Sequence, residues 1–369
     1  MCAKRSHFDD IKTVIKLIMG IIITYFYLSG TTILAHNLDN LDKKRKEIMK
    51  NFYINKKVLV TGGAGFIGSH LCELLIELGA NITIIDDLST GSLNNINKFK
   101  DQITFIQKSI LDYDACLQAT RDQEVIFHLA AFVSVPASVA DPVNCHAINV
   151  DGILYMLEAA RTNHVKRFVF SSSSAIYGPT KGVCYEDQTP QPFSPYGFSK
   201  LIGEYYCRQY HLNYQVQTAC LRYFNVFGER QDPNSQYAAV VAKFRDQMAK
   251  NLPITIFGDG LQTRDFVSVK QVAYANCLVG MQDAPMMDGK AFNIATGKSI
   301  NLLELVDILK EQEFPNYTQE IIFAPARPGD VLNTAADCSR YQKLLDSLYG
   351  PLATSQATKN QGFIAGDFK

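Results

Sequence analysis

The sequence lacks a charge imbalance, a metal-ligand pattern and an internal repeat. Lysine plus arginine and aspartate plus glutamate each total 36, so the net charge gives no indication of a nucleic-acid partner. The nine cysteines and seven histidines show no zinc-ligand spacing, and no metal is implied. No low-complexity tract and no repeat of fixed period interrupts an ordinary globular composition.

Paired cysteines of the Cys-x-x-Cys type are also absent. The odd cysteine count, mostly within apolar runs, fits buried free thiols in a reducing compartment. We therefore expect the folded part of the chain to be cytoplasmic. At 369 residues the chain is long enough for two modest domains or one large α/β unit.

The amino-terminal part contains one uncharged apolar run, Leu17–Ala35, which follows basic residues that include Lys12 and Lys16. At about 1.5 Å of rise per residue, this run is long enough for a minimal transmembrane helix. A cleaved secretory signal has the same basic and then apolar pattern, and a soluble extension is the third alternative. We favour a membrane anchor, with residues 36–55 as a charged linker.

A glycine-rich turn follows the first predicted strand, Lys56–Thr61, and leads into an amphipathic helix. Glycines permit a tight turn and a close approach of the backbone to a pyrophosphate at the helix amino terminus. The order of strand, glycine turn and helix therefore predicts dinucleotide binding. The residues assigned to the cofactor in this segment are Gly62, Gly65, Phe66, Ile67 and Gly68.

The second predicted strand, Asn81–Ile85, ends at an acidic residue, Asp86. A carboxylate at this position can accept hydrogen bonds from both ribose hydroxyls, and it repels a 2′-phosphate. The sequence therefore predicts NAD rather than NADP as the cofactor.

Strand and helix patterns alternate along the next part of the chain, and this alternation predicts an α/β fold with a doubly wound parallel sheet of the Rossmann type. Polar or small residues follow several of the strands, where the carboxyl ends line the ligand crevice; these are Ala130, Ala131, Ser171–Ser174 and Asn225. The further strands are predicted at 103–107, 125–130, 167–172 and 218–223, and the main helices at 144–162 and 195–211.

Tyr196 and Lys200 are four residues apart, so on a helix they share one face. An ammonium beside a phenol lowers the tyrosine pKa from about 10 toward neutrality. Tyr196 is therefore a candidate general base, with the hydroxyl of Ser173 as a helper. Alone, this spacing occurs often by chance, and it gains meaning only beside a cofactor.

Three segments together resemble the extended short-chain dehydrogenase/reductases, and among them most closely the NAD-dependent UDP-sugar 4-epimerases. The resemblance spans about residues 56–345. The segments are Thr-Gly-Gly-Ala-Gly-Phe-Ile-Gly-Ser-His (61–70), Ser-Ser-Ser-Ser-Ala-Ile-Tyr-Gly (171–178) and Ser-Pro-Tyr-Gly-Phe-Ser-Lys (194–200).

The resemblance implies a role for each residue set. Ser173, Tyr196 and Lys200 would be catalytic, with Ser173 and Tyr196 also contacting the sugar. Later segments, 221–228, 257–267 and 326–331, resemble nucleotide-sugar-binding motifs. By this resemblance the further NAD contacts are Ala130, Ala131, Asn149, Tyr196 and Lys200; the diphosphate contacts are Asn225, Arg264 and Arg327, and Asp330 contacts the uridine ribose.

The reaction implied is reversible oxidation at C4 of a UDP-hexose through a transient 4-keto sugar. Related dehydratases and decarboxylases carry a carboxylate at the position of Ala175, so the alanine disfavours both. A small residue at the position of Thr334 resembles enzymes that admit N-acetylated sugars, and we expect acceptance of UDP-GlcNAc and UDP-GalNAc besides UDP-glucose and UDP-galactose. A UDP-uronate 4-epimerase and a catalytically silent nucleotide-sugar-binding protein are the alternatives.

We expect four parts in the chain: residues 1–55 with the hydrophobic segment and linker, 56–225 as the NAD-binding Rossmann domain, 226–345 mainly as a smaller nucleotide-sugar-binding domain, and 346–369 as an atypical tail. The resemblance also implies a homodimer formed through the helices 144–162 and 195–211.

Overall fold

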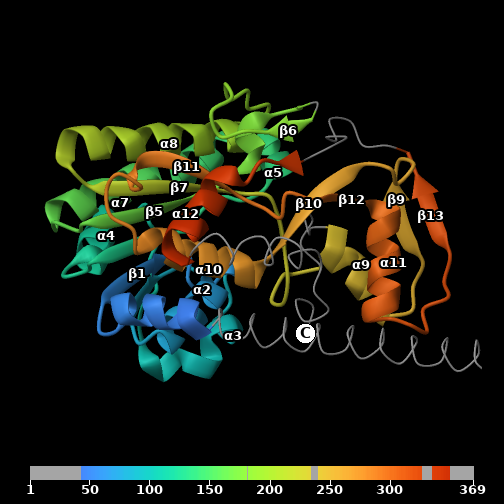
Figure 1. Ribbon diagram of the computed structural model, residues 1–369, viewed down its shortest axis with the longest axis horizontal. Coiled ribbons are helices and arrows are strands. Elements are labelled where there is room, and N and C mark those ends of the chain that lie inside the picture. The colour runs from blue at the N-terminus through green and yellow to red at the C-terminus, as the bar shows by residue number, and fades with distance from the viewer. Residues whose placement is uncertain (1–42, 181, 234–239, 326–334, 350–369) are drawn as a thin grey trace, which may run out of the picture. The chain divides into compact units, whose positions relative to one another are not determined.

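The computed structural model describes residues 43–180, 182–233, 240–325 and 335–349 (Figure 1). The chain divides into two compact units, residues 1–48 and 49–369, and the described residues 43–48 of the first unit are helical. The run Leu17–Ala35 lies outside the described residues. Among the residues that are described, no helix is long and apolar enough to cross a membrane.

A seven-stranded sheet forms the centre of the second unit, and all its neighbouring strands run parallel. The strand order is β11-β7-β5-β4-β1-β2-β3, which reverses direction between β4 and β1. The strands are β1 (Lys57–Thr61), β2 (Asn81–Ile85), β3 (Ile103–Ile106), β4 (Val125–His128), β5 (Arg167–Ser173), β7 (Gln217–Tyr223) and β11 (Asp288–Ile294). The predicted doubly wound sheet is therefore confirmed, and the reversal marks the expected ligand crevice.

The strand β11 was missed in the sequence, although six strands were anticipated. It starts with half-buried Asp288 and Gly289 and exposed Lys290, and only its last four residues, from Ala291, are buried. Its ladder with β7 is interrupted between Asp288 and Lys290. This polar, irregular start hides the apolar signal of a buried strand.

Helices cover both faces of the sheet (Figure 1). Phe127 of β4 pairs with Val169 of β5, so Phe127 and Phe170 point to opposite faces. Phe170 lies against Gly203 of α8, and Phe127 lies against Gly280 of α10. The helices α4 (Tyr113–Thr120), α7 (Gly152–Thr162) and α8 (Pro195–Tyr214) pack together on the Phe170 face, and α2 (Phe66–Glu77) and α10 (Val269–Gly280) pack together on the other.

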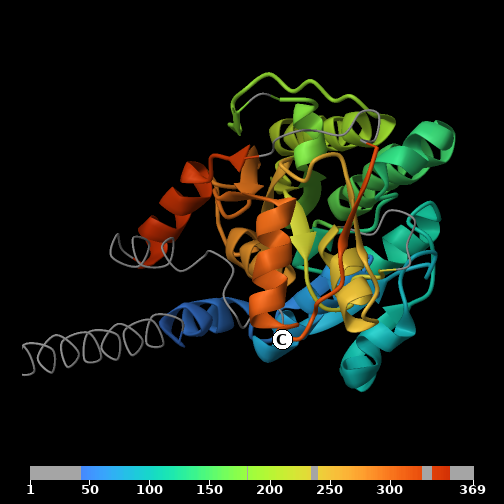
Figure 2. The ribbon, with the colours of Figure 1, turned by 90° about the vertical axis from the view of Figure 1, so that its right-hand side faces the viewer.

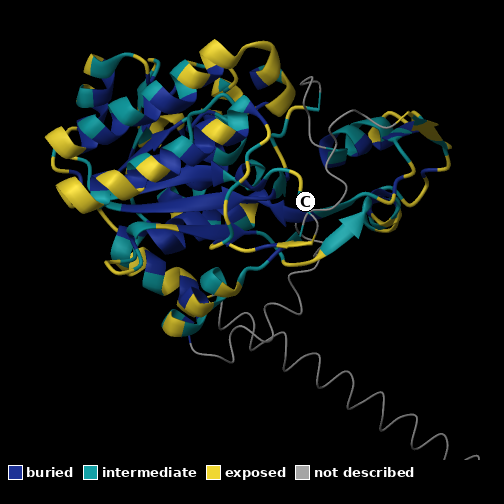
Figure 3. Ribbon diagram, turned by 90° about the horizontal axis from the view of Figure 1, so that it is seen from above, coloured by how far each residue is buried: buried dark blue, intermediate teal, exposed yellow. Residues whose placement is uncertain are grey.

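Burial follows this layered arrangement (Figure 3). The strands between the helices are almost continuously buried, as expected for a parallel sheet covered on both faces. α8 begins where the sequence predicts, because Ser194 accepts a hydrogen bond from Gly197 N and Pro195 occupies the first turn.

The predicted helix 144–162 is interrupted. It consists of α6 (Pro142–His146), a π-helical turn η2 (Ala147–Asp151) and α7. Such π turns occur often at functional sites, and this one carries Asn149.

A smaller group of strands and helices follows β7, with its own apolar core of residues that include Phe227, Phe244, Ile256 and Leu305. Its helices α9 (Val240–Ala249, yellow) and α11 (Leu302–Gln312, orange) lie side by side (Figures 1 and 2). Its strands are β8 (Asn225–Phe227), β9 (Ile254–Phe257), β10 (Thr263–Ser268), β12 (Ser299–Asn301) and β13 (Ile321–Ala324).

The last described helix, α12 (Ser339–Tyr349), continues past residue 345, where we placed the start of the tail. Leu344, Leu345 and Tyr349 of this helix are buried, which explains why it extends that far. The remaining short elements are α3 (Leu93–Ile96), η1 (Asn97–Gln102), α5 (Val135–Ala140), η3 (Ser174–Tyr177), β6 (Val183–Cys184) and β14 (Ala335–Ala336).

Candidate functional site

The glycine turn brings three backbone segments into close contact. Gly62 has a φ of +69°, and a Cβ atom there would lie 2.7 Å from Ala130 N. A Cβ atom at Gly68 would lie 2.1 Å from Gly62 O. Both positions therefore require glycine. Gly65 caps α2 without any side-chain hydrogen bond, so the amino terminus of this helix offers backbone donors to an anion.

The end of β4 is fixed to β1 through one buried hydroxyl. Thr61 Oγ1 accepts hydrogen bonds from Leu129 N at 3.1 Å and Ala130 N at 3.0 Å. Its own hydrogen must then go to His128 Nδ1, 3.0 Å away. Burial lowers the pKa of His128 to about 3, which agrees with a neutral imidazole that accepts at Nδ1. The half-buried pair Ala130 and Ala131 is held beside the glycine turn in this way.

Asp86 lies at the end of β2, directly below the glycine turn. Its carboxylate accepts hydrogen bonds from Ala64 N at 2.9 Å and Leu88 N at 2.8 Å. Burial raises the pKa of Asp86 above its usual range. The turn and the acid are therefore one connected unit.

The structure brings Ser173, Tyr196 and Lys200 together. Ser173 ends β5, and the other two lie in the first turns of α8. Ser173 lies beside Tyr196, because its side chain contributes to the Tyr196 pKa, and Ser173 Oγ accepts a hydrogen bond from Ala175 N at 3.1 Å. Lys200 Nζ donates to Ser171 O at 2.8 Å and lies 5.9 Å from the centre of the Tyr196 ring.

The predicted direction of the Tyr196 pKa is wrong for this structure. Burial raises the pKa of Tyr196, and the Ser173 side chain opposes this only in part. Burial also lowers the pKa of Lys200 to about 8. The prediction considered only the charge of the lysine, which favours the phenolate. Desolvation disfavours the ionised forms of both groups, the phenolate of Tyr196 and the ammonium of Lys200.

Asn149 is buried in the π-helical turn and bonds only to protein groups that surround it. Its Oδ1 accepts from Phe132 N at 2.7 Å, and its Nδ2 donates to Phe132 O at 3.0 Å and Ser199 Oγ at 2.9 Å. Ser199 Oγ in turn donates to Tyr196 O at 2.8 Å. The amide thus connects the loop after β4 with the first turn of α8.

A cavity of about 570 Å³ lies in the smaller group of elements. Asn225 and Arg264 both line it, from the neighbouring strands β8 and β10. Asn225 Nδ2 donates to Asp265 O at 3.0 Å, and Arg264 Nη1 donates to Thr263 O at 2.9 Å. Arg327, Asp330 and Thr334, the other predicted substrate residues, lie outside the described residues.

A second cavity, of about 490 Å³, opens at the amino-terminal ends of β2 and β3, beside Asn81 and Ile103. Ligands of open parallel sheets bind at the carboxyl ends of the strands. This cavity is therefore on the wrong edge of the sheet for the chemistry described above.

Comparison with known proteins places this geometry in a family. A model of the "NAD dependent epimerase/dehydratase family" matches residues 58–295, more than half of the chain. The UDP-glucose 4-epimerase of Mycolicibacterium smegmatis is 37% identical over 294 residues, which cover 78% of this chain and 92% of that protein. The chain belongs to the NAD dependent epimerase/dehydratase family.

Solved structures agree with this assignment. The UDP-N-acetylglucosamine 4-epimerase from Methanobrevibacter ruminantium, in complex with UDP-N-acetylmuramic acid, matches with a TM-score of 0.75 and 37% identity over 84% of this chain and 97% of that one. The UDP-glucose 4-epimerase of Thermus thermophilus, in complex with NAD, matches with a TM-score of 0.71 and 33% identity over 84% of this chain and 100% of that one.

The cofactor of this epimerase/dehydratase family, NAD, fits the residues present. Gly62 and Gly68 let the glycine turn pack tightly on its own backbone and against Ala130, where a side chain would clash, and such a tight turn lets a backbone approach a pyrophosphate. The uncapped amino terminus of α2 suits the pyrophosphate. NAD is the cofactor of this chain.

Several residues that line the cavity of about 570 Å³ are not predicted from the sequence. Phe257 and Gln262 belong to a segment already singled out, 257–267, and could have been named from it. Lys243 and Phe244 come from α9, and no motif marks them. Only the folding of α9 over β9 and β10 places them at the cavity.

We expect Lys200→Met to raise stability near pH 7. The pKa of Lys200 is about 8 in the folded protein and about 10.4 when unfolded, so the unfolded chain binds more protons between these values. The stability of the parent therefore rises as the pH rises through this window. Methionine does not titrate, and the variant should be more stable below pH 8 by up to roughly 3 kcal/mol.

Unfolding of parent and Lys200→Met by denaturant, measured at several pH values between 7 and 10.5, tests this expectation. The difference in unfolding free energy should shrink steadily above pH 8. A difference that stays constant across the whole range would contradict the burial-driven change in the Lys200 pKa.

Proposed function

We propose that this chain interconverts the C4 epimers of a UDP-hexose through a transient 4-keto sugar, with Tyr196 as the general base. The observation that carries the proposal is the cluster of Ser173, Tyr196 and Lys200 at the carboxyl end of β5, on the same edge of the sheet as the glycine turn that follows β1 and fits NAD. Bound NAD supplies reversible hydride transfer at the sugar C4.

Each residue of the cluster has a separate task in this proposal. Tyr196 accepts the proton of the sugar 4-hydroxyl and later returns it, and Ser173 hydrogen-bonds the sugar O4. Because burial disfavours the phenolate, Tyr196 works as a base only while Lys200 is protonated and its charge lies near the ring. Asn149 positions the first turn of α8, which carries Tyr196.

The substrate diphosphate is assigned to Asn225, Arg264 and Arg327, and the uridine ribose to Asp330. Asn225 and Arg264 share one cavity, and guanidinium groups suit a dianionic diphosphate. The related enzyme from Methanobrevibacter ruminantium binds a UDP-sugar, which supports the same class of ligand here.

Ala175 decides between the reaction classes of the family. It lies in η3, two residues after Ser173 and within the segment that follows β5. Elimination and decarboxylation would need a carboxylate at this position, and an alanine offers none. Epimerisation needs no acid there.

Full-length protein should interconvert UDP-glucose and UDP-galactose without net release of NADH, as resolved by chromatography of the products. Tyr196→Phe should lower kcat by about 10²–10⁴-fold, because it removes the base. Tyr214→Phe is the matched control, since Tyr214 is an exposed tyrosine of the same helix. The proposal would be wrong if the parent turned over no UDP-hexose or UDP-uronate and Tyr196→Phe behaved like the parent. A catalytically silent binding protein would then be the remaining alternative.

The same assay determines which UDP-hexoses the enzyme accepts. With threonine at position 334 we expect UDP-GlcNAc and UDP-GalNAc to be accepted as well, and Thr334→Tyr should remove this activity while turnover of UDP-glucose persists. Equal loss of both activities would contradict the assignment of this position to the pocket beside C2.

We also propose a homodimer formed through α8 and the helices next to it. Phe198, Tyr205 and Leu212 are exposed on α8 at seven-residue spacing, so they form one apolar stripe. Val143 of α6, a helix that packs against α8, is also exposed. Apolar patches of this kind often mark interfaces.

Tyr205→Glu combined with Leu212→Glu should convert the dimer to a monomer, because charges would be buried in the interface. Sedimentation or light scattering gives the mass. Phe323→Glu, at an exposed apolar residue of β13, should leave the mass unchanged. If the double variant has the same mass in solution as the parent, the proposed interface is wrong.

We further propose that Leu17–Ala35 anchors a cytoplasmic catalytic domain to a membrane. The cysteines of the described residues are all free thiols, and all but Cys338 are buried, which suits a reducing compartment. The proposed division at residues 55 and 225 accompanies this arrangement, with β11 returning from the smaller domain to the sheet, whereas α12 crosses the boundary expected at residue 345.

Carbonate-washed membranes should retain the full-length chain, and removal of residues 1–35 should release it. The amino-terminal sequence of the retained protein should include Leu17, because an anchor is not cleaved. Recovery of the full-length chain only in the soluble fraction would exclude the anchor, and a mature chain that starts after Ala35 would indicate a signal peptide.

A further inference from the structure

A buried ionic group lies directly behind the Ser173, Tyr196 and Lys200 cluster. Ser172 precedes Ser173 in β5, Glu204 lies one turn beyond Lys200 in α8, and Arg222 is the β7 partner of Ser172 in the sheet register. Ser172, Glu204 and Arg222 are 2%, 7% and 4% exposed, so all three are removed from water.

The contacts of these residues join three elements. Arg222 donates to Glu204 in a fork, from Nε to Oε1 at 2.9 Å and from Nη2 to Oε2 at 2.7 Å. Ser172 Oγ donates to the same Oε1. The Glu204 carboxylate of α8 therefore accepts hydrogen bonds from both β5 and β7. Its contact with Arg222 of β7 has the bidentate geometry that guanidinium and carboxylate groups favour.

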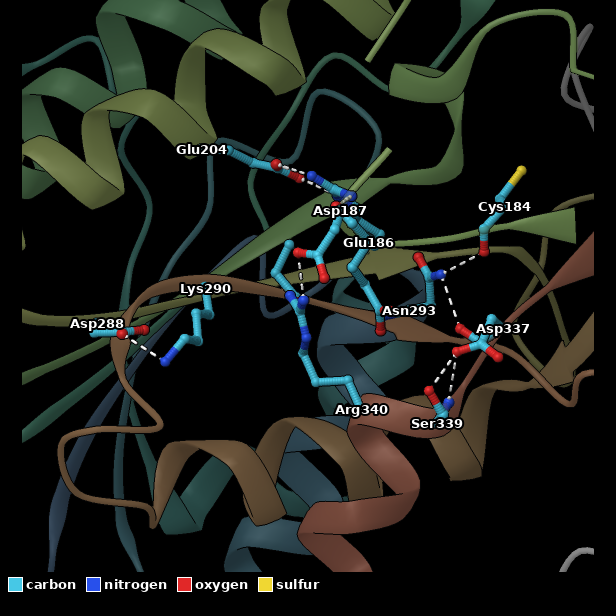
Figure 4. A network of polar contacts seen from close by, with 12 residues as sticks. Cys184, Glu186, Asp187, Glu204, Asp288, Lys290, Asn293, Asp337, Ser339 and Arg340 are labelled. Carbon is cyan, nitrogen blue, oxygen red and sulfur yellow. Dashed lines mark hydrogen bonds and ion pairs between the residues drawn. The ribbon is translucent and has the colours of Figure 1, made fainter. Parts of the chain in front are cut away.

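The rest of the Arg222 guanidinium is also occupied. Nη1 donates to Tyr177 Oη at 2.8 Å and to Glu186 O at 2.9 Å. Tyr177 Oη donates onward to Asn293 Oδ1 at 2.6 Å. Figure 4 shows Glu204 at one side of this polar network and Asn293, with Cys184, at the other.

Stability alone is a weak explanation for such a group. Desolvation of two buried charges cancels much of their attraction, and apolar residues of similar volume often stabilise a protein as well or better. An apolar replacement would lose directional contacts, because the strength of a hydrogen bond depends on the rotation and height of α8 above β5 far more than that of an apolar contact does.

Tyr196, Lys200 and Glu204 follow one another at intervals of four residues, so they lie along the same side of α8. Lys200 is bonded to Ser171 O at 2.8 Å, and Glu204 is bonded to Ser172. α8 is thus attached to consecutive residues of β5 at two points, one turn apart. The relative position of Ser173 and Tyr196 follows from these two attachments.

We propose that Ser172, Glu204 and Arg222 form a positioning bracket, defined as these three residues, that holds the Tyr196 hydroxyl against Ser173 for proton transfer. This inference rests on the proposed function. The bracket touches neither substrate nor cofactor, and it acts through the attachment of α8 to β5. Its loss should reduce kcat more than substrate binding, because misplaced reacting groups lose rate steeply.

The bracket also predicts a change at Tyr196 itself. The Ser173 side chain lowers the Tyr196 pKa, so loosening this contact should raise it. The titratable groups that face Tyr196 from the neighbouring elements are Cys145 of α6, Lys200 of α8 and Tyr223 of β7. None of them is altered when the Ser172 hydroxyl is removed.

Ser172→Ala is the central test, with Thr218→Val as the matched control. Thr218 Oγ1 of β7 donates to Cys207 O of α8 at 2.7 Å, so the control removes a buried hydroxyl bond from a strand to the same helix, about three turns beyond Tyr196. Both variants should show similar, small losses in Tm.

Ser172→Ala should lower kcat about tenfold or more, change KM by less than about twofold, and move the acid limb of the pH profile to higher pH. NMR of labelled tyrosine rings, assigned with Tyr196→Phe, should show a raised Tyr196 pKa. Thr218→Val should keep the parental kcat and Tyr196 pKa. Parental values in Ser172→Ala, or an equal loss in Thr218→Val, would overturn the bracket.

The NMR measurement separates two failures. If the parent turns over no UDP-sugar, the proposed function fails, whereas a raised Tyr196 pKa in Ser172→Ala still supports the bracket. A second variant, Glu204→Leu with Arg222→Met, replaces both charges by apolar groups and should fold with nearly parental Tm. The kcat of this double variant should be lower than that of the parent, as in Ser172→Ala. A parental kcat would show that the ion pair contributes to stability only.

Discussion

The close contact between α8 and β5 is the constraint on which the site depends. A Cβ atom at Gly203 would lie 2.5 Å from the Phe170 ring, so the helix reaches this depth only with glycine there. At this depth Lys200 can donate to Ser171 O, and Glu204 can reach Ser172. The residues assigned to proton transfer come from the end of the strand and the first turns of the helix. Their geometry is therefore set by backbone packing before any ligand binds.

This arrangement buries the Lys200 ammonium and leaves Tyr196 half-buried beside it. Burial lowers the pKa of Lys200 to about 8 and raises the pKa of Tyr196, so both groups are less stable in their ionised forms than on the surface. Asp265 of β10 shows the same effect, because burial raises its pKa to about 6 despite hydrogen bonds from Thr296 and Gly297. Active sites commonly trade stability for such groups, and the elements around this one are fixed by hydrogen bonds rather than by apolar contact alone.

How much could be predicted from the sequence depends on how local each signal is. The glycine turn, Asp86 and the spacing of Tyr196 and Lys200 lie within short segments, and the fold they predict is the one observed. β11 was missed because its start is polar, and the π-helical turn around Asn149 has no sequence signature. The direction of the Tyr196 pKa was wrong because it depends on burial, which is a property of the packed helix. Glu204 and its pairing with Arg222 are not predicted from the sequence, because the β5–β7 register and the packing of α8 on both strands bring the two together.

The same polar network also reaches the strand pair β6 and β14. From Arg222 it passes through Tyr177 to Asn293, whose Nδ2 donates to Cys184 O and Asp337 O, both at 3.0 Å. Asp337 directly follows β14, and β14 pairs with β6. In the sequence, β14 is the first element after residues 326–334, which carry the proposed diphosphate, ribose and sugar contacts. One continuous series of hydrogen bonds, most of them buried, therefore connects Glu204 of α8 with Asp337, the residue that follows β14. An epimerase must hold the nucleotide firmly while its sugar turns over, and a shared support for both parts suits that requirement.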